Sequence, residues 1–255
     1  HIFANLALSD EEYRNLYNHE YFHGNEYSNY ILDKTVLQKN FINRLNILKK
    51  YITKSQEKSL LEIGSAYGFF LEKAKDYFLN VEGVDITVDG INFAKQKLKL
   101  KAKNVDFLKW DTKKNKWDVI CLWDTVEHLK RPDLFIKKAS NVLNQDGLIA
   151  ITTGDINSYL AKFRGKNWRL IHPPTHVHYF SKKSLTNLLF KEGFEIIHFS
   201  YPGFYRSLDN IFYNIFVLRL KLNWIYKILQ FLQLTRLSLY FNTYDICYII
   251  AKKIR

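Results

Sequence analysis

The chain has 255 residues, 47% of them hydrophobic, and a formal net charge of +13 at pH 7. We expect one α/β domain over residues 1–255, because this length and apolar content support a single large core. The two cysteines, Cys121 and Cys247, lie in apolar segments, which favours buried free thiols and a reducing cytoplasm over a disulfide framework. No RNA-binding motif accompanies the positive charge.

The first 56 residues precede the predicted core, and charged residues at positions 10–14 interrupt any run that would form a signal peptide. This N-terminal segment is dense in aromatic residues between positions 20 and 30. The aromatic side chains in question are Tyr21, Phe22, Tyr27 and Tyr30.

Residues 60–74 predict a strand, a tight loop and a helix. The apolar run Leu60–Ile63 leads into a loop with small residues at 64, 66 and 68, and a helical pattern follows. Small residues let the backbone approach a ligand, and the helix offers free N–H groups and a positive dipole end. A dinucleotide fingerprint would need a small residue at position 69, which is Phe69, so a different nucleotide-like cofactor is favoured.

Further strands are predicted at intervals along the chain. Residues 81–86 read as a second strand, and its Asp85 lies 21 residues past Gly64, where a carboxylate can accept both ribose hydroxyls. Residues 105–111 read as a third strand and 117–124 as a fourth. Pro132 suits the first turn of a helix, and a fifth strand follows at 148–152.

From about residue 57 to 153 the order of these motifs resembles the class I S-adenosylmethionine-dependent methyltransferases, whose motif E/D-x-G-x-G-x-G matches Glu62 to Gly68 with Ala66 at the middle glycine. The resemblance implies a Rossmann-like seven-stranded mixed sheet with an antiparallel last strand. It implies S-adenosylmethionine as cofactor, S-adenosylhomocysteine as product, and a leading arm that forms a lid or packs on the sheet. The cofactor contacts that we expect are Tyr30, Glu62, Gly64, Ser65, Ala66, Gly68, Asp85, Ile86, Trp110, Asp111, Trp123 and Asp124.

The C-terminal half, residues 154–255, extends the resemblance. Residues 168–181 are similar to the segment before the last helix in a bacterial small-molecule and ubiquinone-type branch, and Ser181 suits a helix N-cap. Strands six and seven are predicted at 194–201 and 244–251. Between them, residues 205–240 form an insert of two predicted amphipathic helices, because no uncharged run approaches the ~20 residues of a bilayer span.

Methyl transfer to oxygen needs a base as well as alignment of the reactants, and histidine suits that role near neutral pH. The candidates are His128, His176 and His178, with His172 beside them. Asp124, Glu127 and His128 also resemble a cluster that binds Mg²⁺ in ubiquinone-type and small-RNA methyltransferases. Many relatives carry an acid–His pair here without metal, and we do not expect Mg²⁺.

The sequence thus predicts a methyltransferase acting on a hydroxyl of a small molecule, sugar or lipid-linked precursor. The alternatives are a Mg²⁺-dependent RNA 2′-O-methyltransferase and a non-catalytic cofactor-binding module. The lysines from Lys95 to Lys103 have two interpretations. They form a solvated helix face, or they attract a phosphate-bearing or membrane-bound substrate. We expect no nucleic-acid partner and a cytoplasmic protein, with peripheral contact at the inner membrane face or a homodimer as roles for residues 205–240.

Overall fold

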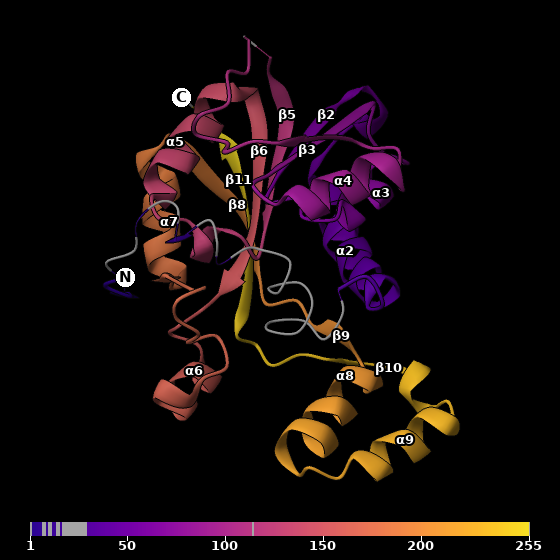
Figure 1. Ribbon diagram of the computed structural model, residues 1–255. Helices are drawn as coiled ribbons and strands as arrows, with labels where there is room; N and C mark the ends of the chain where they lie inside the picture. The colour runs from indigo at the N-terminus through magenta and orange to yellow at the C-terminus, as the bar shows by residue number, and fades with distance from the viewer. Residues whose placement is uncertain are drawn as a thin grey trace.

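Seven strands form the central sheet in the order β4–β3–β2–β5–β6–β11–β8 (Figure 1). The computed structural model describes residues 2–6, 9, 12, 13, 16, 30–113 and 115–254. The strands of this sheet are β2 (Ser59–Ile63), β3 (Asn80–Asp85), β4 (Lys101–Asn104), β5 (Trp117–Trp123), β6 (Leu143–Gly154), β8 (Phe194–Ser200) and β11 (Ile246–Lys253). β11 runs antiparallel to β6 and β8, while the other neighbouring pairs are parallel, which confirms the predicted mixed sheet.

Helices cover both faces of the sheet (Figure 1). α2 (Lys34–Leu48), α3 (Phe69–Ala74) and α4 (Val88–Gln96) pack on one face, and α5 (Pro132–Val142) and α7 (Lys182–Lys191) pack on the other. Alternate residues of the central strands enter the two cores. Leu60 packs in the core beneath α2, α3 and α4, and Leu61 packs in the core beneath α5 and α7. The central strands are therefore apolar throughout, because both of their faces are buried.

Two predicted helix starts are confirmed. Pro132 is the first residue of α5, where its missing N–H costs no hydrogen bond. Ser181 caps α7 by accepting a hydrogen bond from the Ser184 N–H at 3.1 Å, and Ser184 returns a bond to the Ser181 N–H.

The predicted position of the third strand is wrong. The strand is β4, Lys101–Asn104, and residues 105–116 form a loop in the part that the structure describes. β4 is the edge strand of the sheet, and only Ala102 of its residues is buried, so it lacks the apolar run that marks a central strand. Lys101 and Lys103 therefore lie on a strand rather than on the helix, since α4 ends at Gln96.

The insert between β8 and β11 is helical, as predicted, but it stands on a small two-stranded sheet. β9 (Phe204–Ser207) pairs antiparallel with β10 (Ser238–Phe241). Between them lie α8 (Leu208–Phe212), a π-helical segment η6 (Tyr213–Arg219), α9 (Asn223–Phe231) and a 3₁₀ turn η7 (Leu234–Arg236). Figure 1 shows these helices projecting beyond the end of the central sheet.

Shorter elements complete the fold. α6 (Tyr159–Arg164) and the 3₁₀ turn η5 (Gly165–Asn167) follow β6, and β1 (Ile2–Phe3) pairs with β7 (His178–Tyr179). The remaining 3₁₀ turns are η2 (Lys49–Tyr51), η3 (Ser55–Glu57) and η4 (Val126–His128). Among the described residues, no helix has the length and apolar character to cross a membrane.

Candidate active site

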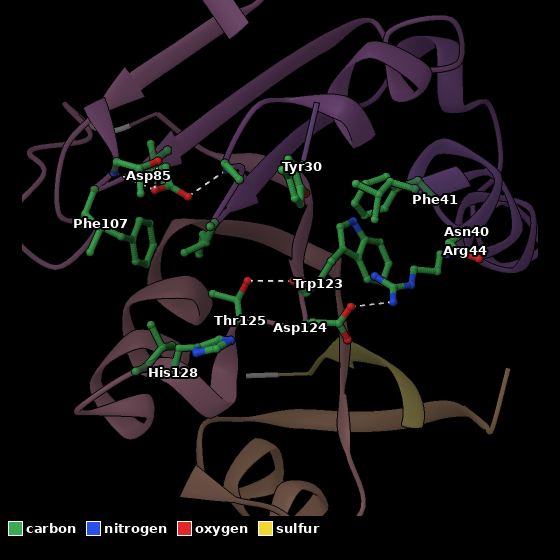
Figure 2. Close-up of a pocket in the computed structure, with 18 of the residues that line it drawn as sticks. Tyr30, Asn40, Phe41, Arg44, Asp85, Phe107, Trp123, Asp124, Thr125 and His128 are labelled. Atoms are coloured by element: carbon green, nitrogen blue, oxygen red, sulfur yellow. Dashed lines mark hydrogen bonds and ion pairs between the residues drawn. The ribbon is translucent and has the colours of Figure 1, made fainter. Parts of the chain in front are cut away.

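A cavity of about 620 Å³ lies where the carboxyl ends of β2, β3 and β5 meet (Figure 2). The loop after β2, the end of β3, the loop after β4 and the end of β5 line it on the sheet side. α2 and the base of the insert close it on the opposite side. In an open sheet whose strands run mainly parallel, this edge is where ligands bind.

The loop after β2 brings bare backbone into the cavity. Gly64 has φ +78°, and a Cβ there would lie 2.5 Å from the Thr125 Oγ1. Ala66 lines the cavity at φ +43°, a conformation that glycine adopts more easily. Ser65 and Gly68 do not line the cavity: Ser65 is buried beneath the loop, and Gly68 precedes α3.

Asp85 ends β3 with its carboxylate held in place. Its Oδ2 accepts from the Ala66 N–H at 2.8 Å, and its Oδ1 accepts from the Thr87 N–H at 2.8 Å and from the Thr87 Oγ1 at 2.7 Å. A carboxylate has about four acceptor positions, so Oδ2 keeps one for a ligand hydroxyl. Burial raises the pKa of Asp85, against these hydrogen bonds. Ile86 lines the cavity beside it.

The shifted position of β4 changes which acid enters the cavity. Asp106 and Phe107 line it, whereas Trp110 and Asp111, which the sequence favoured, do not. Trp110 instead packs against Trp117, with ring centroids 5.5 Å apart. The signal that would have found Asp106 is its place two residues after the short basic strand.

Tyr30 and Glu62 belong to the layer around the cavity. Tyr30 lines it and stacks on Phe69, with ring centroids 5.3 Å apart, so it serves both packing and lining. Tyr21, Phe22 and Tyr27 lie outside the described residues. Glu62 is 2% exposed and does not reach the cavity, and its Oε2 has no hydrogen-bond partner among the residues that the structure describes. Burial, followed by the charge of Asp85, raises the pKa of Glu62 well above its usual range.

Arg44 of α2, which the sequence did not single out, pairs with Asp124 at the end of β5 (Figure 2). The Arg44 Nη2 lies 2.6 Å from the Asp124 Oδ2, and the Thr152 Oγ1 donates to the Asp124 Oδ1 at 2.8 Å. Burial alone would raise the pKa of Asp124, but the Arg44 guanidinium lowers it. The guanidinium also lies over the Trp123 ring, 5.6 Å from its centroid. Both Trp123 and Asp124 line the cavity.

His128 lines the cavity from η4, immediately after β5. Its Nδ1 donates to the Thr175 carbonyl oxygen at 2.9 Å, which leaves the lone pair on Nε2. Burial lowers the pKa of His128, so the imidazole is neutral at pH 7. A neutral imidazole at a ligand cavity is suited to accept a proton.

His176 and Glu127 stand behind His128. The His128 and His176 ring centroids lie 4.6 Å apart, and the His176 Nδ1 donates to the Leu170 carbonyl oxygen at 2.9 Å. Glu127 is 5% exposed, and burial together with the charge of Asp124 raises its pKa to about 8. His178 lies apart: it sits on β7, does not line the cavity, and donates from Nε2 to the Lys130 carbonyl oxygen at 3.4 Å.

The structure gathers a different metal-ligand set from the one in the sequence motif. Ligand atoms of Glu127, His128 and His176 lie within 4.8 Å of one another, whereas Asp124 is engaged by Arg44. Two imidazoles with Nδ1 bound to carbonyl oxygens are typical of metal ligands, and one carboxylate with two imidazoles suits a transition ion better than Mg²⁺.

Comparison with known proteins identifies the family. A model of the methyltransferase domain family matches residues 37–199, more than half of the chain. The chain belongs to the class I S-adenosylmethionine-dependent methyltransferases. The predicted family is therefore confirmed.

This methyltransferase is 31% identical over 151 residues to a ubiquinone biosynthesis O-methyltransferase of Pelagibacter ubique, which covers 54% of this chain and 62% of the relative. A second protein of that description, from Glaesserella parasuis, is 28% identical over 137 residues, covering 49% and 58%. The chain therefore matches about three fifths of the length of these relatives.

Among solved structures, magnesium protoporphyrin IX methyltransferase from Synechocystis PCC 6803 with bound S-adenosylhomocysteine superposes with a TM-score of 0.60. It is 11% identical and covers 94% of this chain and 98% of its own. This likeness confirms the fold. The family implies S-adenosylmethionine as cofactor, and the cavity fits it: Gly64 leaves room that a side chain would fill, and Asp85 retains an acceptor.

Proposed function

We propose that this methyltransferase moves the methyl group of S-adenosylmethionine to a hydroxyl oxygen of a small molecule, sugar or lipid-linked precursor, with His128 as base. The observation that carries the proposal is the place of His128, on the cavity wall with its Nδ1 bound to the Thr175 carbonyl oxygen. Both curated relatives are described as O-methyltransferases, which supports an oxygen acceptor.

The cofactor half of the cavity is the edge formed by β2, β3 and β5. Gly64 and Ala66 would admit the cofactor against the backbone, and Asp85 would accept a ribose hydroxyl. Asp106 and Phe107 line the cavity after the strand next to β3, and we expect them to contact the adenine. When bound, the cofactor supplies a methyl group on a positively charged sulfur.

The acceptor half lies between His128 and the base of the insert. Arg169, Phe204 and Tyr205 line it, and these residues would orient the acceptor. The His128 Nε2 would take the acceptor's hydroxyl proton as the acceptor oxygen bonds to the methyl carbon. The bound cofactor would supply the methyl group and would keep the electron pair of the broken carbon–sulfur bond on sulfur, as a neutral thioether. His176 is a positioning residue, because it packs against the His128 ring.

A metal-assisted form of the same reaction is favoured by one observation, the proximity of Glu127, His128 and His176. Those residues would hold a divalent ion that stabilises the acceptor as its alkoxide, and the His128 Nε2 would then be a ligand rather than a base. The two forms differ in their response to chelation, since the base mechanism needs no ion.

Methyl transfer from tritiated S-adenosylmethionine to a panel of catechols and sugars tests the proposal. We expect His128→Ala to lower turnover by roughly 10²–10⁴-fold, the usual contribution of a general base. His176→Ala should lower it less. His178→Ala is the matched control and should retain the wild-type rate, because His178 lies outside the cavity.

Calorimetric titration with S-adenosylhomocysteine separates chemistry from cofactor binding, and its dissociation constant should change less than threefold in these variants. Full turnover by His128→Ala would remove His128 as the base. Loss of turnover with EDTA and recovery with a divalent ion would establish the metal-assisted form. Salt-sensitive binding and methylation of an oligoribonucleotide would favour an RNA acceptor instead.

A further inference from the structure

α9 presents an apolar stripe to the solvent. Trp224, Ile228 and Phe231 are 62%, 47% and 86% exposed, and their spacing of four and three residues places them on one face of the helix. The opposite stripe, with Ile225 and Leu229, is half-buried against the rest of the insert. The Tyr226 hydroxyl donates to the Asp209 Oδ1 at 2.8 Å, which ties α9 to α8. The exposed stripe is therefore held in a fixed orientation.

A second apolar group lies at the same end of the molecule. On α6, Tyr159 and Phe163 are 94% and 86% exposed and lie one helical turn apart. Figure 1 shows α6 and the helices of the insert projecting past the same end of the central sheet. We call α6 and residues 208–232 the projecting end. Large apolar side chains gathered on one face of a protein mark an interaction site.

The charge of the projecting end is strongly positive. Arg219, Lys221 and Lys227 accompany the apolar residues of the insert, and Lys162 and Arg164 accompany those of α6. Asp209 is the one acidic residue in residues 204–241, and the Tyr226 hydroxyl engages it. Apolar residues beside basic ones are the composition of helices that lie in the interface of an anionic bilayer.

We propose that the projecting end docks on an anionic bilayer surface, with α9 lying in the plane of the interface and Trp224 and Phe231 inserted among the lipids. A second copy of the chain fits this face poorly, because two-fold pairing would bring the basic residues of both copies together and bury them. α9 has nine residues, too few to span the ~30 Å hydrocarbon core of a bilayer.

The projecting end joins the wall of the cavity. Ser207 and Asn210, at the start of α8, line the cavity beside Phe204 and Tyr205 of β9. Docking would therefore place the acceptor half of the cavity near the membrane, where a lipid-linked acceptor resides. This consequence rests on the proposed function, whereas docking itself does not.

Flotation with vesicles tests docking without any methyl transfer. We expect the wild-type protein to float with vesicles of phosphatidylcholine and phosphatidylglycerol at 3:1 and at least tenfold less with phosphatidylcholine alone. Trp224→Asp with Phe231→Asp should lower partitioning to the anionic vesicles at least tenfold. Phe190→Asp is the matched control: Phe190 is 69% exposed on α7, shortly before the amino end of β8 and so at the opposite end of the sheet, and its variant should float like the wild type.

Trp224 supplies a direct readout. Trp117, Trp123 and Trp168 are each at most 5% exposed, and the half-buried Trp110 packs against Trp117 at the amino end of β5, away from the projecting end. Brominated lipids should quench the Trp224 fluorescence, and Trp224→Phe should remove the quenched component. Equal flotation of the double variant and the wild type, with wild-type circular dichroism, would overturn the proposal. It would also be overturned by a dimer in analytical ultracentrifugation that the double substitution dissociates, if the wild type binds no vesicles.

Discussion

The acids around the cavity differ in charge because their neighbours differ. Asp124 meets a guanidinium, which lowers its pKa against the effect of burial. Glu62 has no ion-pair partner among the described residues, and burial, followed by the charge of Asp85, raises the pKa of this carboxyl although the Arg44 charge lowers it. The fold therefore shifts Asp124 toward its charged form and Glu62 toward its neutral form, and both shifts make the free energy of unfolding depend on pH.

Glu62→Gln should reduce the loss of stability at alkaline pH. A carboxyl whose folded pKa is raised stabilises the fold fully below its unfolded pKa, and this contribution is lost as pH rises through the folded pKa. Each pH unit between the unfolded pKa and the raised folded pKa costs about 1.4 kcal/mol, and glutamine avoids that cost because it does not ionise. Urea unfolding of both proteins from pH 5 to 9 measures the difference. Parallel pH profiles would show that Glu62 does not titrate in the folded protein.

Asp85→Ala should weaken S-adenosylhomocysteine binding by about 1.5–3 kcal/mol, the range for a lost hydrogen bond to a charged group. Asp85 is suited to this role because it lines the cavity and its Oδ2 retains an acceptor position. Asp111→Ala is the control and should bind normally, since Asp111 lies outside the cavity. Calorimetry that ranks the two variants in the reverse order would remove Asp85 from the cofactor site and assign Asp111 to it.

At the scale of elements, the turn between β2 and α3 determines the shape of the cofactor half. Gly64, Ala66 and Gly68 all have positive φ, which folds the loop tightly over the end of β2. The turn has little space around Gly68. A Cβ on Gly68 would lie 2.9 Å from the Leu100 Cδ1 and 3.0 Å from the Ala94 Cβ.

Gly68→Ala should therefore destabilise the protein more than Gly165→Ala. Both glycines have positive φ, and alanine in that region costs about 1–2 kcal/mol. Gly165 has no neighbouring atom within 4 Å of an added Cβ, so its substitution carries the conformational cost alone. Overpacking against Leu100 and Ala94 should add about 1–3 kcal/mol at Gly68. Denaturant midpoints of the two variants provide the measurement. Equal losses of stability would show that Leu100 and Ala94 move aside to accommodate the added Cβ.

At the scale of the molecule, the cavity joins parts of the fold that lie far apart in the chain. The sheet edge supplies the cofactor half, α2 contributes Arg44, and the base of the insert supplies Tyr205 and Asn210. A ligand in the cavity bridges these parts, so binding should oppose global unfolding as well as local motion.

S-adenosylhomocysteine at 100 times its dissociation constant should raise the free energy of unfolding by about 2.7 kcal/mol, because it binds the folded state alone. NAD at the same concentration should have no effect, since Phe69 occupies the position where a dinucleotide loop needs a small residue. Thermal unfolding with each ligand decides between them. An equal shift with NAD would contradict the cofactor assignment.

The sequence alone was sufficient to predict the turn between β2 and α3 and the strand that ends at Asp85. Residues 60–74 and the acid of Asp85 follow local rules: apolar runs form buried strands, and small residues form the turn. The antiparallel last strand came from the family resemblance, and the sheet order confirms it. Local rules failed at β4, because an edge strand with one buried residue resembles a loop. The cavity is lined there by Asp106 and Phe107, whereas the sequence favoured Trp110 and Asp111.

Only the tertiary structure decided which side chains surround His128 and Asp124 at the cavity. Arg44 reaches Asp124 because α2 packs across the sheet edge, and no local pattern predicts that ion pair. His176 approaches Glu127 and His128 because the loop before α7 folds over the end of β5. The sequence predicted three histidines of equal standing, and the fold separates them: His128 lines the cavity, His176 packs behind it and His178 joins β7. Periodicity and turn chemistry act over a few residues, whereas such contacts join distant segments whose approach depends on the packing of the whole chain.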